Sequence, residues 1–179
     1  MKTDYFLKLV IIGLFSASMI EYVHGSDYSS ITTILNHYKN EIVTIKDLDA
    51  EVKEAFLNVE QRRNPGIVIA DFDGDGKEDV ALLTKEQKSN ALTLRFFLCK
   101  KRCKGVKSID LGVFYGIQLI TPIKKGEVVE PTKSLPAPPG IKPVRLSNTA
   151  VHFGVYGKTS IAYFWEKEKQ DFVSIATSD

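Results

Sequence analysis

The stretch GIVIADFDGDGKEDVALLT, residues 66–84, decides how the middle of this chain folds. It contains two short apolar runs, residues 66–70 and 80–84, on either side of an acidic loop. Both runs are partly β-branched and too short for helices, so they predict two strands joined by the loop. The loop has aspartate at its positions 1, 3, 5 and 9 and glycine at position 6: Asp71, Asp73, Asp75, Asp79 and Gly76.

The spacing of these aspartates predicts a metal site. Alternate residues of a tight loop turn their side chains toward a common centre, where four carboxylates repel one another unless a cation lies among them. Carboxylate and carbonyl oxygens, without His or Cys, favour Ca²⁺ over Zn²⁺ or Cu²⁺. We therefore predict one Ca²⁺ bound by Asp71, Asp73, Asp75 and Asp79 and by the backbone carbonyl of Lys77. The glycine at position 6 would supply a positive φ. The alternative is an Asp-Gly turn that holds no metal.

The residues around the loop indicate which kind of calcium loop it is. An EF-hand has flanking helices and a glutamate at position 12, whereas position 12 here is Leu82. The loop instead resembles those of the FG-GAP/VCBS repeat group, which includes the propeller loops of integrin α chains. The matching residues are the four aspartates, with Ile69-Ala70 before them and Val80-Ala81 after them. The resemblance implies a Ca²⁺ site; because the chain has one copy of the motif, it does not imply a propeller.

The first 25 residues have the pattern of an export signal. Lys2 and Lys8 precede an apolar stretch, residues 9–20, and Val23 and Gly25 are the small residues at positions −3 and −1 before a cleavage site at Ser26. The apolar stretch is short for a membrane span. We predict a signal peptide over residues 1–25 and an exported protein, periplasmic or secreted, with no membrane span after cleavage. An uncleaved membrane anchor is the alternative.

The remaining residues, 26–179, suit one domain. The net charge is +2, and the signal region carries two lysines and two acidic residues, Asp4 and Glu21, so cleavage leaves it at +2. Such a small charge does not imply a nucleic-acid partner. Export is compatible with calcium binding, because extracellular modules need only weak affinity, roughly 10⁻⁴ to 10⁻³ M.

The two cysteines, Cys99 and Cys103, are separated by three basic residues. In an exported protein an even number of cysteines suggests a disulfide, and a three-residue hairpin loop would place these two opposite each other. We predict a Cys99–Cys103 disulfide. Two free thiols remain an alternative, and a metal site made only of cysteines lacks further ligands.

The periodicity of apolar residues predicts the fold class. Residues 29–42 and 47–63 have the spacing of helical faces, and the chain after Gly66 reads as strands. The clearest strands are Ala150–Tyr156, Ser160–Trp165 and Asp171–Thr177. We predict an α+β domain with two N-terminal helices packed on a mainly antiparallel β-sheet of about eight strands.

Two segments are candidate interaction surfaces. Residues 131–143 hold five of the seven prolines, which predicts an exposed extended loop. The largest basic cluster consists of Lys100, Lys101, Arg102, Lys104 and Lys107. Such a run is usually a solvated hairpin tip, and otherwise contacts an anionic lipid, polymer or protein surface.

Nothing in the sequence indicates catalysis. The chain after residue 25 has two histidines, His37 and His152, and no nucleophile elbow or phosphate-binding loop. We therefore expect an exported calcium-binding module with a non-catalytic role, binding an envelope protein or a cell-surface polymer. One version is an inhibitor or immunity protein of a cell-envelope toxin or hydrolase. The alternative is a calcium-dependent hydrolase of unrecognised type.

Overall fold

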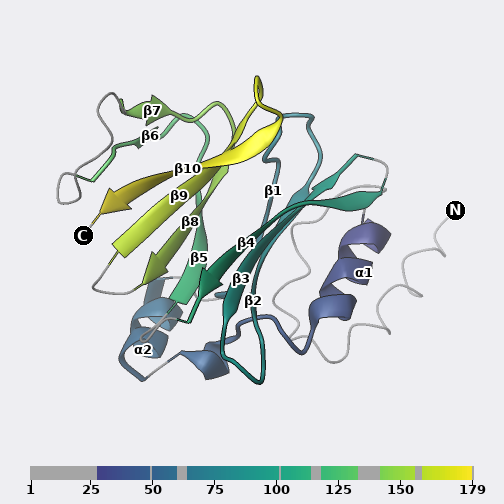
Figure 1. Cartoon of the computed structure of the whole chain (residues 1–179), viewed down its shortest axis with the longest axis vertical. Helices are drawn as coiled ribbons and strands as arrows, with labels where there is room; N and C mark the ends of the chain where they lie inside the picture. The colour runs from purple at the N-terminus through teal and green to yellow at the C-terminus, as the bar shows by residue number, and fades with distance from the viewer. Residues whose placement is uncertain are drawn as a thin grey trace, which may run out of the picture.

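Figure 1 shows the computed structural model, which describes residues 28–48, 50–59, 64–100, 102–113, 118–132, 142–155 and 159–178. The predicted signal peptide lies outside the described residues, as does most of the proline-rich segment, residues 133–141. The helical elements are α1 (Tyr28–Tyr38), the 3-10 helix η2 (Ile45–Asp47) and α2 (Ala50–Val59). The strands are β1 (Ile67–Ala70), β2 (Asp79–Lys85), β3 (Leu92–Cys99), β4 (Cys103–Gly112), β5 (Gln118–Ile123), β6 (Val128–Val129), β7 (Val144–Arg145), β8 (Ala150–Val155), β9 (Thr159–Glu166) and β10 (Asp171–Ser178).

The described strands form three antiparallel sheets. Sheet A has the order β1-β2-β3-β4, and sheet B has the order β10-β9-β8-β5. Sheet C pairs the two-residue strands β6 and β7. Within sheet A every neighbour in space is also a neighbour in the chain, as expected for successive hairpins.

The predicted α+β fold, with two helices packed on one sheet of about eight strands, is wrong. The described part of the chain is mostly β, with ten strands in three antiparallel sheets. The two four-stranded sheets bury their apolar faces against each other, so helices are not needed to cover the core. Helix α1 covers the outer face of sheet A. Helix α2 lies apart from the main core: its Phe56 packs with Leu48, Ile45 and Leu119 of β5 in a small separate cluster.

The main core lies between sheets A and B. Alternate side chains of each strand point to the same face, and the inward residues of both sheets meet in one cluster. At its centre Phe96 from β3 stacks on Phe172 from β10, with ring centroids 3.9 Å apart. Phe72, which follows β1, meets both rings edge-on, with centroids 6.1 and 6.0 Å away. The acidic loop is therefore attached to the core through Phe72, which is fully buried.

Strand β2 is buried on both of its faces. Ala81 and Leu83 face sheet B, whereas Val80 and Leu82 face the cluster under helix α1. This explains why residues 80–83 are continuously apolar and do not alternate with polar residues. The strand that begins at Asp79 is therefore the most enclosed part of sheet A.

Sheets A and B contact each other at two pairs of edge strands, β1 with β5 and β4 with β10, and the contacts differ between the two pairs. At one side, the Ile120 N–H at β5 donates to the Pro65 carbonyl just before β1, at 2.8 Å. At the other side, the Lys107 ammonium on β4 reaches β10, where it contacts the Asp171 carboxylate at 2.6 Å and the Phe172 carbonyl at 2.8 Å. The seam between β4 and β10 is thus bridged by a side chain.

Several predicted strands agree with the structure, and two strands were missed. The three C-terminal strands and the pair around the acidic loop lie within one or two residues of the expected positions. Strands β6 and β7 have only two residues each, which is too short for any periodicity to be visible in the sequence.

Among the residues that the structure describes, none of the helices has the length and apolar character that a membrane span requires.

We expect Phe96→Ala to destabilise the protein by about 3–5 kcal/mol, because it empties the centre of the aromatic cluster. Leu57→Ala is the control, since Leu57 on α2 is 39% exposed, and it should change stability by less than about 1 kcal/mol. Urea unfolding of both variants measures the difference. Equal effects of the two substitutions would contradict the placement of the core between the sheets.

Candidate metal site at the aspartate loop

The pairing of β1 with β2 positions the aspartate loop. The ladder ends with Ala70 opposite Asp79, so residues 71–78 form the connection between the two strands. The glycine predicted to have a positive φ does so: φ of Gly76 is 84°. Gly74 adopts the same conformation, with φ of 81°. Both residues lie where an L side chain would be strained.

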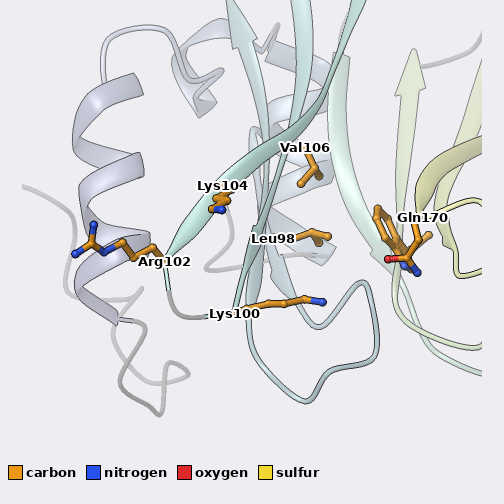
Figure 2. A pocket seen from close by; sticks show the side chains of 7 residues that line it. Leu98, Lys100, Arg102, Lys104, Val106 and Gln170 are labelled. Carbon is orange, nitrogen blue, oxygen red and sulfur yellow. The ribbon is translucent and has the colours of Figure 1, made fainter.

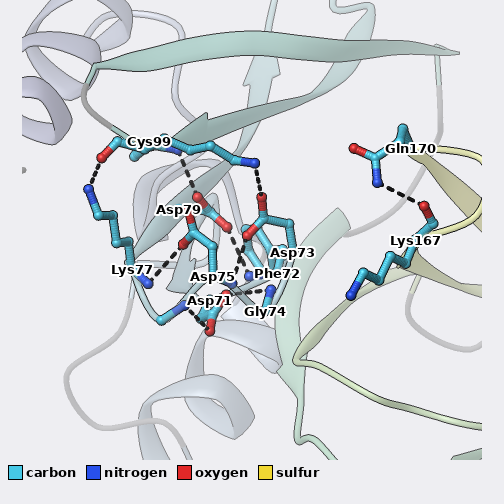
Figure 3. Close-up of polar contacts among 12 residues, drawn as sticks. Asp71, Phe72, Asp73, Gly74, Asp75, Lys77, Asp79, Cys99, Lys167 and Gln170 are labelled. Carbon is cyan, nitrogen blue, oxygen red and sulfur yellow. Dashed lines mark hydrogen bonds and ion pairs between the residues drawn. The ribbon is translucent and has the colours of Figure 1, made fainter.

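Three of the four predicted carboxylates converge. Asp71, Asp73 and Asp79 each place a carboxylate oxygen within 4.8 Å of the other two, and the three can hold a metal ion (Figure 3). Asp75 is exposed, and its carboxylate is not among these three. Its Oδ1 instead accepts a hydrogen bond from the Lys77 N–H at 3.0 Å.

Hydrogen bonds from the backbone give the loop its shape. The two oxygens of Asp71 accept the N–H groups of Gly74, at 2.7 Å, and Gly76, at 3.0 Å. Asp73 Oδ1 accepts the N–H of Asp75 at 3.0 Å. These bonds fold the loop back over its own carboxylates and fix the direction of each side chain.

Asp79 is the buried member of the cluster, with 1% of its surface exposed. Its Oδ2 accepts the Phe72 N–H at 2.9 Å, and its Oδ1 accepts the Cys99 N–H at 2.8 Å. Burial raises the pKa of this carboxyl from 3.8 to about 6; the two N–H donors act in the opposite direction, and Asp73 and Asp75 add repulsion. The carboxylate therefore joins three segments: the loop, the start of β2 and the end of β3.

The loop is attached to the neighbouring hairpin by further contacts. Cys99 and Cys103 form the predicted disulfide, and they lie opposite each other in the β3–β4 ladder, which confirms the sequence prediction. Lys100 Nζ lies 3.4 Å from Asp73 Oδ2. The Lys77 amine donates to the Lys100 carbonyl. The aspartate loop and the disulfide hairpin thus form one connected unit (Figure 3).

Sequence reasoning missed two residues beside the loop. In the sequence Lys100 belongs to the basic cluster, and only the folding of the β3–β4 hairpin brings it to Asp73. Asn148, between β7 and β8, lies against Gly74: a Cβ on Gly74 would be 2.8 Å from its Oδ1. Nothing in the sequence signals the Asn148 contact, because the two positions are far apart in the chain.

The predicted basic cluster is divided by the structure. Lys100 lies at the aspartate loop, whereas Lys107 bridges to Asp171 across the seam. Arg102 and Lys104 are exposed, and Lys101 lies outside the described residues. The basic residues therefore do not form one continuous patch.

Comparison with family models, curated proteins and solved structures found no match to this chain.

The raised pKa of Asp79 predicts a pH dependence for the metal-free protein. The folded state binds the Asp79 proton more tightly than the unfolded chain does, so this contribution is full below about pH 4 and is lost as the pH rises through about 6. The free energy of unfolding should fall across this range by about 3 kcal/mol relative to Asp79→Asn. Urea unfolding of metal-stripped protein at several pH values measures it. A wild-type curve parallel to that of Asp79→Asn would contradict the burial of this carboxyl.

The contact between Gly74 and Asn148 predicts unequal effects of two alanine substitutions. Gly74→Ala and Gly76→Ala each force alanine into a positive φ, which should lower the free energy of unfolding by about 1–2 kcal/mol. Gly74→Ala also brings a methyl group against Asn148, whereas nothing lies within 4 Å at Gly76. Thermal unfolding should therefore show a larger loss of stability for Gly74→Ala. The opposite order would show that the loop does not pack on Asn148 as described.

Proposed function

We propose that this protein is an exported calcium-binding module with a non-catalytic role. The observation that carries the proposal is the convergence of the Asp71, Asp73 and Asp79 carboxylates. Three negative charges within such distances repel one another strongly, and a divalent cation among them removes that repulsion. Lys100 compensates poorly, because its side chain is 66% exposed and exposed ion pairs contribute about 0–1 kcal/mol.

The donor set favours Ca²⁺ over other metals. The converging groups are carboxylates only, and no His or Cys belongs to this cluster in the described part of the chain. Hard oxygen ligands suit Ca²⁺, which takes six to eight of them with flexible geometry. In the proposed site the Lys77 carbonyl and Asp75, directly or through water, supply further oxygens. The resemblance to FG-GAP/VCBS loops supports the same ion.

In this proposal the calcium ion stabilises the fold and takes no part in a chemical reaction. Asp79 is 1% exposed, and each of its two oxygens accepts a backbone N–H group, so its carboxylate is not presented to a substrate in solution. The loop is connected to the core by Phe72 and to the disulfide hairpin by Asp79 and Lys100. Calcium would therefore stiffen one end of sheet A and the hairpin beside it.

The N-terminal sequence and the disulfide support a location outside the cytoplasm. Residues 1–25 have the pattern of an export signal, and disulfides persist in oxidising compartments. The proposed protein is periplasmic or secreted, and its partner is an envelope protein or a cell-surface polymer. An inhibitor or immunity protein of an envelope toxin or hydrolase is one concrete form of this role.

The direct test is calorimetric titration of metal-stripped protein, residues 26–179, with Ca²⁺, Mg²⁺ and Zn²⁺. We expect one Ca²⁺ site, with a dissociation constant of about 10⁻³ M or lower, and weaker binding of Mg²⁺. Asp71→Asn should weaken Ca²⁺ binding at least tenfold without unfolding the protein. Glu54→Gln is the matched control, because Glu54 is an exposed carboxylate on helix α2, and it should bind as the wild type does.

Two results would overturn the proposal. Unchanged calcium binding in Asp71→Asn would remove the loop as the site. Calcium-dependent turnover of an envelope substrate, lost in Asp71→Asn while its melting temperature is retained, would favour the hydrolase instead.

A further inference from the structure

A groove of about 700 Å³ opens where sheets A and B diverge beside the disulfide hairpin. Sheet A contributes Leu98 from β3 and Lys104 and Val106 from β4; sheet B contributes Trp165 from β9 and Gln170 from the β9–β10 turn. Lys100 and Arg102 of the hairpin also line it. Its volume lies in the range of small-molecule sites, about 300–1,000 Å³.

The floor of the groove is apolar. Leu98 and Trp165 are buried members of the main core, with 8% and 9% of their surfaces exposed. Val106 is the extra residue of a bulge in β4, between Gly105 opposite Phe97 and Lys107 opposite Phe96, and it is 43% exposed. An apolar ligand in the groove would cover Val106 and the accessible edges of the other two side chains.

A cation stands directly beside this floor. Lys104 lies opposite Leu98 in the β3–β4 ladder, so the two side chains project from the same face of sheet A. Lys104 forms no ion pair with any described residue. Figure 2 shows Leu98 and Lys100 directed toward the side where Gln170 lies, whereas Arg102 extends away from it. Three basic residues line the groove: Lys100, Arg102 and Lys104. Lys104 is the one that lies opposite Leu98, whereas Lys100 Nζ lies 3.4 Å from Asp73 Oδ2.

The seam below the groove limits what can enter. Lys107 crosses from β4 to Asp171 and the Phe172 carbonyl, so an added β-strand cannot insert between the edges of β4 and β10 without breaking these contacts. A short ligand that lies in the groove breaks none of them. The geometry thus favours a small molecule over a peptide added to the sheet.

We propose that this groove binds a single-chain amphiphile, with its anionic head group at Lys104 and its apolar chain against Leu98, Val106 and Trp165. Charge complementarity selects the head group, and the apolar floor selects the chain. The stems of Lys100 and Lys104 extend the apolar surface while their ammonium groups stay in water. This binding is separate from calcium binding and does not require an ion in the aspartate loop.

Trp165 provides a reporter within the site, because it is the only tryptophan in the chain. Metal-stripped protein in chelator is titrated with decyl phosphate below its micelle concentration, followed by Trp165 emission and by calorimetry. We expect a saturable change in emission and one binding site. Decyltrimethylammonium, which has the same chain and the opposite charge, should bind at least tenfold more weakly. Chelator keeps this result independent of the calcium proposal.

Two variants and a control locate the ligand. Lys104→Glu should weaken decyl phosphate binding at least tenfold, and Val106→Glu should do the same by placing a charge on the floor. Both side chains are exposed in the free protein, so neither change should unfold it. Lys88→Glu, at an exposed lysine in the β2–β3 turn, should bind as the wild type does.

The proposal is overturned if decyl phosphate gives neither heat nor a change in emission up to its micelle concentration. It is also overturned if both head-group charges bind equally, or if Lys104→Glu binds normally. Binding only to anionic phospholipid vesicles, or only to an acidic peptide, would assign the surface to a different partner.

Discussion

The buried carboxylate of Asp79 is the interaction on which this end of the molecule depends. It accepts one N–H from the loop at Phe72 and one from the end of β3 at Cys99. Those donors would otherwise be buried without partners, at a cost of about 1–3 kcal/mol each. The carboxylate satisfies them but carries its own cost of burial, which raises its pKa to about 6. A cation at the loop would relieve this cost, since it stabilises the ionised form that the two N–H groups also prefer.

The same carboxylate connects the two candidate sites. Asp79 and Asp73 attach the aspartate loop to the hairpin that carries the Cys99–Cys103 disulfide. That hairpin provides Lys100 and the beginning of β4, which form one wall of the groove. Phe72 joins the loop to the aromatic core between the sheets. The loop therefore supports a surface that faces a different ligand, and stiffening the loop would also stiffen that surface.

The sequence predicted the local elements well and their assembly poorly. The aspartate spacing identified the loop, and the cysteine spacing identified the disulfide, because both depend on residues close together in the chain. The apolar run of residues 80–84 located β2, but it could not show that sheet B, and not a pair of helices, covers the inner face of sheet A. Contacts between distant segments, such as Gly74 with Asn148 and Lys107 with Asp171, left no local signal. Asp75 likewise lies outside the three converging carboxylates because of the backbone conformation of the loop, which the spacing of the aspartates alone does not determine.

Amide hydrogen exchange at Cys99 and Phe72 tests whether Asp79 couples the aspartate loop to the hairpin, because these two N–H groups donate to its carboxylate. We expect slow exchange at both N–H groups with Ca²⁺ bound, and a joint increase in exchange rate across residues 66–84 and at Cys99 when the ion is removed. Amides of sheet B, such as that of Phe153, should change little. If removing Ca²⁺ left exchange at Cys99 and Phe72 unchanged, or accelerated both sheets equally, Asp79 would not couple the loop to the hairpin as described.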